Sequence, residues 1–340
     1  MTREADQRRP EGVSRFHEAI EAELRHVLAE RGEPLYRMME YQLGWIDEHG
    51  EPRSAPEAPR VLPALCLTLC EALGGSVATA TPPAAAVELV SLFSQVHDDI
   101  QDGRPTRGGH PSVWWVWGPA QAINAGDGLH ALARLSLFRM AERGSSLDAV
   151  LEATRTLDRA CLELFEGQHM ALRFQEQMAV TREAYTRMVE RRAGALPGCA
   201  AELAALVAGA DASVREACSL AGHRIGTAMQ IRADINDLWE RDPRDEQAGD
   251  ALNRAALPFI HALEVAPVSV KHELGTLSMK RVLEPGDAPR VTELLDGVGA
   301  REACAARADQ ALREALDALA AARIPPGALD EILGAMDLVT

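Results

Sequence analysis

The chain has 340 residues, 47% of them hydrophobic and 25% charged, which is enough apolar sequence for a substantial core. Its formal net charge of −16 argues against a surface that binds nucleic acid or an anionic membrane. No apolar run has the length of a transmembrane helix and no signal core opens the chain, so we expect a cytoplasmic protein without a membrane span. The six cysteines lie scattered in helical segments without a second pair to complete a zinc site, which predicts reduced core residues.

Helical periodicity recurs along most of the chain after a charged segment, residues 1–14, that is predicted to be a flexible tail. The predicted helices cover residues 16–30, 35–48, 61–73, 82–102, 113–143 with an interruption near 118–119, 148–176, 181–209, 212–239, 250–264, 266–283, 287–298, 300–322 and 326–338. Pro82 and Pro83 are predicted to open their helix, at the position that proline prefers. Because no stretch alternates with period two, we expect an all-α bundle that forms a single domain over residues 15–340.

Three aspartates end the apolar run SLFSQVHDDIQD. Asp98 and Asp102 are four residues apart and share a helix face, while Asp99 is rotated by about 100°. Carboxylates crowded in this way repel one another, and hard oxygen ligands at this spacing suit Mg²⁺. A solvated acidic helix end is the alternative, although acidic clusters belong at helix N-termini and this one comes late in its helix.

A second acidic cluster lies in the predicted helix 212–239, in the run GHRIGTAMQIRADINDLWE. Asp234 and Asp237 are three residues apart and share a face with Gln230. Two acidic helices of one bundle could hold metal ions between them. On spacing alone, the end of an ordinary amphipathic helix explains this cluster better.

Four blocks in order, HDDIQDGRPTRGGHP, AINAGDGL, FEGQHMAL and GTAMQIRADIND, resemble the trans-isoprenyl diphosphate synthase family. The resemblance implies an all-α bundle around a deep central cavity, usually as a homodimer. It also implies up to three Mg²⁺ ions that bridge two aspartate motifs and the diphosphate of an allylic prenyl substrate, here of C15 to C20 length. In such chemistry the ions hold the leaving pyrophosphate, and a dry cavity protects the allylic cation.

The resemblance also implies roles for individual residues. Metal ligands would come from Asp98, Asp99, Asp102, Asp234 and Asp237, with Asp98 and Asp234 facing each other across the cavity. Arg107 would clamp the diphosphate, and Gln168 and Gln230 would line the cation region. Arg192 and Arg254 stand where the family has diphosphate-binding lysines, in a chain with only two lysines, Lys271 and Lys280, among 35 basic residues.

The chain departs from the family where isopentenyl diphosphate binds. The run EAPRVLP has Pro59 and Leu62 at two cationic positions, and only Arg60 remains to bind this substrate. Ser91 replaces a histidine, and Gly108 replaces the second arginine after the first motif. Each lost charge-assisted contact would forfeit ~1.5–3 kcal/mol. The first aspartate of the second motif is also missing, because Ala233 stands there.

This asymmetry predicts an enzyme that ionises a prenyl diphosphate and then cyclises or rearranges it, or transfers it to an unusual acceptor. An ordinary chain-elongating synthase is the alternative, and a non-catalytic subunit of a partner synthase is a second one. Phe93, five residues before Asp98, would close the cavity floor against long chains, or would be plain core. Trp114, Trp115 and Trp117 could stabilise a cation, although core or interface packing is the more ordinary role.

Overall fold

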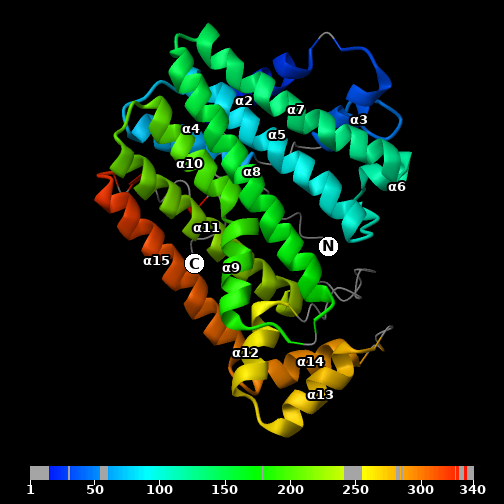
Figure 1. Ribbon diagram of the computed structural model, residues 1–340. Helices are drawn as coiled ribbons and strands as arrows, with labels where there is room; N and C mark the ends of the chain where they lie inside the picture. The colour runs from blue at the N-terminus through cyan, green and yellow to red at the C-terminus, as the bar shows by residue number, and fades with distance from the viewer. Residues whose placement is uncertain are drawn as a thin grey trace, which may run out of the picture. The chain divides into compact units, whose positions relative to one another are not determined.

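A computed structural model of the chain describes residues 15–29, 31–53, 60–177, 179–240, 255–280, 284, 286–325, 327–328 and 333–334. In this part of the chain the regular elements are helices (Figure 1), apart from one pair of two-residue strands. The all-α prediction is therefore confirmed. The predicted tail and most of the last predicted helix, 326–338, lie outside the described residues, and so do Pro59 and Arg254.

Two compact units divide the chain. The first takes its residues from 1–159, 199–219 and 320–340, and the second from 160–198 and 220–319. Helices α8 (Leu147–Gln175), α10 (Ala195–Val207) and α11 (Ala212–Trp239) contribute residues to both units. Asp98 and Asp234 lie in different units, and their expected face-to-face placement stays a prediction.

The first unit is built on a long buried helix. Besides its parts of α8, α10 and α11, this unit contains α2 (His17–Leu28), α3 (Pro34–Gln42), α4 (Val61–Ala72), α5 (Val77–Gln101), α6 (Val113–Trp117) and α7 (Pro119–Glu142). Helix α5 is the buried one, and α7 and α4 pack along it. By length and hydropathy α5 could cross a membrane, but 72% of its apolar window is buried inside the protein, as expected of a core helix. It carries the first aspartates at its C-terminal end.

The prediction that Pro82 and Pro83 open α5 is wrong, because the helix begins at Val77 and holds both prolines in its interior. Ser76 caps the true start by accepting a hydrogen bond from the Thr79 amide. Since Pro82 has no N–H, the carbonyl of Ala78 loses its helical partner. Arg143 replaces that partner by donating to the Ala78 oxygen at 2.9 Å. A side chain from the end of α7 thus compensates for the proline in α5.

The second unit has two hydrophobic cores. Helix α9 (Arg182–Arg192) and the C-terminal half of α11 surround the first core, with α12 (Leu257–Val265) and α15 (Ala300–Ala321). Helix α12 also borders the second core, with α13 (Val268–Ser278) and α14 (Asp287–Asp296). The prediction of one helix over 181–209 is wrong, because α9 ends at Arg192 and α10 begins at Ala195. A Cβ at Gly194 would lie 2.3 Å from the Glu190 carbonyl oxygen, so the junction between the helices is too tight for any larger residue.

Candidate active site

The first aspartate motif lies at the C-terminal end of α5, where Asp102 is the C-cap residue. The helix dipole is negative at this end, so three carboxylates here are unfavourable unless cations offset them. Their environments differ in the way that helical geometry predicts. Asp98 is half-buried and Asp102 belongs to an exposed stretch, whereas Asp99 is only 1% exposed.

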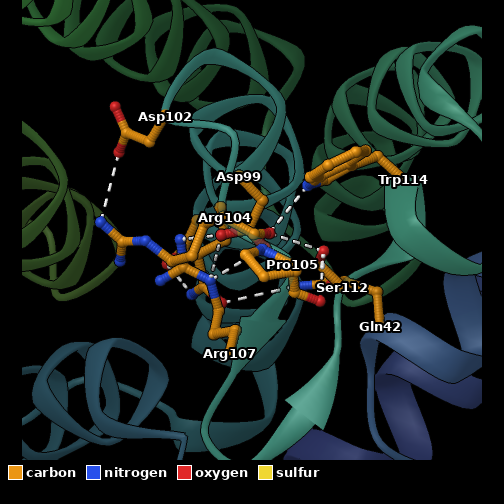
Figure 2. Close-up of polar contacts among 10 residues, drawn as sticks. Gln42, Asp99, Asp102, Arg104, Pro105, Arg107, Ser112 and Trp114 are labelled. Atoms are coloured by element: carbon orange, nitrogen blue, oxygen red, sulfur yellow. Dashed lines mark hydrogen bonds and ion pairs between the residues drawn. The ribbon is translucent and has the colours of Figure 1, made fainter. Parts of the chain in front are cut away.

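Asp99 is bound by Arg107 (Figure 2). The Arg107 Nη2 donates to Asp99 Oδ1 at 2.6 Å, and Nε donates to both carboxylate oxygens at 3.0 and 3.1 Å. Burial raises the pKa of Asp99, and the hydrogen bonds and charge of Arg107 lower it. The sequence predicted that Arg107 binds the substrate diphosphate and that Asp99 binds a metal ion. In this structure the two side chains bind each other.

Arg107 is held in place by a hairpin that the sequence did not predict. Strand β1 (Thr106–Arg107) pairs antiparallel with β2 (His110–Pro111), and the turn between them is Gly108–Gly109. Both glycines have positive φ, +57° and +78°, as a tight two-residue hairpin turn requires. The turn conformation therefore favours glycine at position 108, which gives a structural reason for the absence of an arginine there.

Trp114 and Ser112 fasten this hairpin to the end of α5 (Figure 2). The Trp114 indole N–H donates to the Arg104 carbonyl at 2.8 Å, and the Ser112 hydroxyl donates to the same oxygen at 2.8 Å. The Arg104 guanidinium lies 3.3 Å from Asp102. Trp114 thus holds the loop that follows the aspartates, a role that none of the sequence interpretations gave it. Arg104, two residues after Asp102, is a candidate site residue that sequence analysis missed.

The donor set of the first motif fits a magnesium ion. Asp98 and Asp102 stand one turn apart, and Mg²⁺ binds through one or two carboxylates, completing its shell with water and substrate phosphate. Among the described residues, no three His, Cys, Asp or Glu side chains form a metal-binding group. Substrate oxygens and water would therefore have to complete the coordination of an ion at this site.

The second motif has a different environment. Asp234 is 5% exposed and accepts three hydrogen bonds inside the second unit, from the Tyr185 hydroxyl at 2.6 Å, the Gln230 amide at 2.8 Å and the Leu257 N–H at 3.0 Å. Burial raises the pKa of Asp234, and the three donors lower it. Asp237, one turn further along α11, is exposed, and so is Ala233.

Arg60, the one remaining cation of the expected isopentenyl diphosphate site, is 4% exposed. Its Nε donates to Glu21 at 2.8 Å, Nη1 to Glu88 at 3.2 Å and Nη2 to the Leu43 carbonyl at 2.6 Å. Trp45 adds a hydrogen bond to Glu21 at 2.6 Å. The whole guanidinium is thus used inside the first unit, which is not the environment expected of a residue that binds a diphosphate.

Phe93 lies in an aromatic group one turn before the aspartates. Its ring stacks on His130 of α7 with centroids 4.8 Å apart, and it meets His97 edge-on at 4.6 Å. Phe93 is 7% exposed. A Cβ at Gly126 would lie 2.5 Å from the His97 ring, so this glycine makes room for the group. These contacts suit both roles considered for Phe93, the core and the cavity floor.

Helices α8 and α9 make a close backbone contact within the second unit, next to two residues expected near the substrate. Gly167 of α8 approaches the last turn of α9 so closely that a Cβ would lie 2.4 Å from the Arg192 nitrogen. Gln168 follows Gly167 directly, so its backbone lies beside that of Arg192. This close contact explains why the FEGQ block has a glycine at position 167. Gln230, also expected near the cation, donates to Asp234.

The comparisons with known proteins agree with this architecture. A sequence model of the family described as polyprenyl synthetase matches residues 45–295. A geranylgeranyl diphosphate synthase of Mycobacterium tuberculosis is 34% identical over 291 residues, covering 84% of this chain and 82% of its own length. A (2E,6E)-farnesyl diphosphate synthase of the same species is 39% identical over 228 residues, covering 66% and 61%.

Among solved structures, a polyprenyl synthetase from Streptomyces coelicolor superimposes with a TM-score of 0.86 at 29% identity, covering 97% of this chain and 99% of that one. A geranylgeranyl pyrophosphate synthetase from Pyrococcus horikoshii gives a TM-score of 0.83 at 28% identity, covering 97% and 98%. Fold and motifs together define a prenyl-transferring enzyme. The chain belongs to the polyprenyl synthetase family, which confirms the resemblance seen in the sequence.

Proposed function

We propose that the chain elongates an allylic prenyl diphosphate by joining it to isopentenyl diphosphate. The observation that carries this proposal is the first aspartate motif, with its arginine-bearing hairpin, on a chain similar over 84% of its length to a geranylgeranyl diphosphate synthase. Sequence analysis put cyclisation first and elongation second. The similarity to named farnesyl and geranylgeranyl diphosphate synthases favours elongation.

In this reaction the C1–O bond of the allylic substrate breaks, and its electron pair leaves with the pyrophosphate. The double bond of isopentenyl diphosphate then attacks C1, and loss of a proton forms the new double bond. Asp98 and Asp102 would hold magnesium, which would supply the positive charge that neutralises the leaving pyrophosphate. Arg107 adds a guanidinium beside the motif, and Asp99 fixes its direction. The family is generally magnesium-dependent, and the binding of up to three Mg²⁺ ions, as the resemblance implies, is part of the proposal.

A second candidate is favoured by one specific observation. Arg60 is bound internally, and Leu62, Ser91 and Gly108 offer no cation where the family holds isopentenyl diphosphate. Ser91 instead accepts a hydrogen bond from the Gln95 amide at 3.4 Å. An enzyme with this second subsite would ionise its allylic substrate and then cyclise it or transfer it to an uncharged acceptor.

One experiment separates the two candidates. Purified protein is incubated with Mg²⁺ and the C10, C15 or C20 allylic diphosphate, with and without radiolabelled isopentenyl diphosphate, and the products are analysed. Label in a longer prenyl diphosphate supports elongation. Pyrophosphate and a terpene hydrocarbon or alcohol, formed equally without isopentenyl diphosphate, would replace elongation by cyclisation.

We further propose a cytoplasmic homodimer. Helix α7 exposes Ile123, Leu135 and Phe138 at 44%, 44% and 54%, and the start of α8 exposes Leu147 at 73%. Large exposed apolar side chains on neighbouring segments are typical of an interface. A second copy of the chain is the partner proposed for them. Phe138→Asp should shift the species seen by analytical ultracentrifugation from dimer to monomer, whereas a monomeric wild type would refute the dimer.

A further inference from the structure

Asp234 has the contacts of a residue that holds the fold together. Its Oδ2 accepts from the Tyr185 hydroxyl of α9 and from the Leu257 N–H, and its Oδ1 accepts from Gln230 one turn earlier in α11. Tyr185 and Leu257 are 2% and 5% exposed and belong to the first core of the second unit. Both carboxylate oxygens are therefore engaged by groups of the protein interior.

The bond to Leu257 gives the Asp234 side chain a structural role at the start of α12. Leu257 is the first residue of α12, and its N–H is one of the donors that a helix start leaves without an internal partner. The preceding residue, Ala256, has no side chain that can cap the helix. Asp234 supplies the missing acceptor from α11, and its negative charge suits the positive end of the α12 dipole.

A metal ion would have to compete with these contacts. An ion at Asp234 would compete with Tyr185 and Leu257 at Oδ2 or with Gln230 at Oδ1, and the carboxylate is only 5% exposed. Displacing Tyr185 or Leu257 would leave a buried hydroxyl or N–H without an acceptor. Ala233 and Asp237 stand one turn apart on the exposed face of α11, whereas Asp234 is buried, so Asp237 is the aspartate of this motif that faces outward.

We propose that Asp234 is a positioning residue that fastens the start of α12 and the α9 tyrosine to α11, and that the second aspartate motif can bind metal only through Asp237. This inference rests on the proposed function, because it concerns the second metal-binding motif of that site. It departs from the expectation that Asp234 and Asp237 are both metal ligands.

The test measures ion binding and melting without turnover, so its result stays readable if the proposed reaction fails. Mn²⁺ bound per chain is measured by equilibrium dialysis in the presence of saturating inorganic pyrophosphate, for wild type and for Asp234→Asn, Asp237→Asn and Ala233→Asp. An asparagine at 234 can still accept from Tyr185 and Leu257, and Gln230 can turn its amide oxygen toward the new NH₂ group. Asp234→Asn thus removes the charge and keeps the contacts.

We expect Asp234→Asn to bind as many Mn²⁺ ions as wild type, and Ala233→Asp to bind Mn²⁺ more tightly because it adds a carboxylate four residues from Asp237. In thermal melts, Asp234→Ala should melt several degrees lower than wild type, since it leaves Tyr185 and Leu257 without their acceptor. Asp237→Asn should bind fewer Mn²⁺ ions than wild type and should melt like wild type. Loss of a bound ion in Asp234→Asn, or an unchanged melting temperature in Asp234→Ala, would overturn the proposal.

Discussion

Replacing Arg60 by methionine tests whether this arginine serves the substrate or the fold. The substitution keeps much of the side-chain volume but leaves Glu21 and Glu88, which are 6% and 7% exposed, without their shared cation. Removing one partner of a buried ion pair costs about 3–5 kcal/mol, because the remaining charge stays buried and uncompensated. A loss of that size is a large part of the stability of a typical domain.

The pH dependence of stability provides a second, independent test of this prediction. Burial raises the pKa of Glu88 in the wild type even with Arg60 present. Without the arginine, the folded protein should hold the proton of Glu88 still more strongly than the unfolded chain does. Stability then falls as the pH rises from the ordinary carboxyl value toward the raised pKa of Glu88. The difference between wild type and Arg60→Met should therefore shrink below about pH 4.5.

The assay is thermal and urea denaturation at several pH values, followed by steady-state kinetics on the folded variant. Arg155→Met is the matched control, because the Arg155 side chain is 74% exposed and its pair with Glu152 should contribute little. A double variant, Arg60→Met with Glu88→Gln, should recover part of the loss by removing one buried charge. If Arg60→Met were as stable as wild type and only raised the KM for isopentenyl diphosphate, the assignment of Arg60 to the fold would be refuted.

Three further predictions concern the end of α5 and the hairpin after it. Asp98→Ala and Asp102→Ala should each abolish turnover in a folded protein, because each removes a proposed magnesium ligand. Near-normal turnover in either variant would refute the metal assignment. Arg107→Lys should lower kcat and destabilise the loop, because lysine cannot bind the Asp99 carboxylate through two nitrogens; unchanged kinetics and melting would refute that role. Phe93→Ala should lower stability by about 3–5 kcal/mol and give longer prenyl products, and an unchanged product length in a folded variant would assign Phe93 to the core alone.

The fold was predictable from the sequence because its signals are local. Apolar residues at helical spacing placed α4, α7, α8 and α11 within one or two residues of their observed ends. The start of α5 was predicted wrongly at its two prolines, because Arg143, which donates to the carbonyl that Pro82 leaves without a partner, lies far away in sequence. No local pattern could reveal that contact. The hairpin after the first motif was likewise missed, although its Gly-Gly turn is a recognised hairpin signal.

The candidate site was less predictable, because residue type does not tell what a side chain binds. Arg60 was the one cation left in its block and was therefore given to the substrate, yet its partners come from α2 and α5. Trp114 was considered for its ring, while its indole N–H makes the contact that matters for the loop. The side chains that bind Arg60 belong to other helices, and the carbonyl that binds Trp114 lies ten residues earlier in the sequence, before the hairpin.

The two aspartate motifs share a geometry that residue counting alone could have suggested. In each, the first and fifth positions are four residues apart and share a helix face, whereas the second position is rotated by about 100° toward the core. The structure shows the same consequence twice, since Asp99 is 1% exposed and bound by Arg107, and Asp234 is 5% exposed and bound by Tyr185. An aspartate at the second position therefore serves its own unit, so the carboxylate missing at position 233 is not replaced by its neighbour.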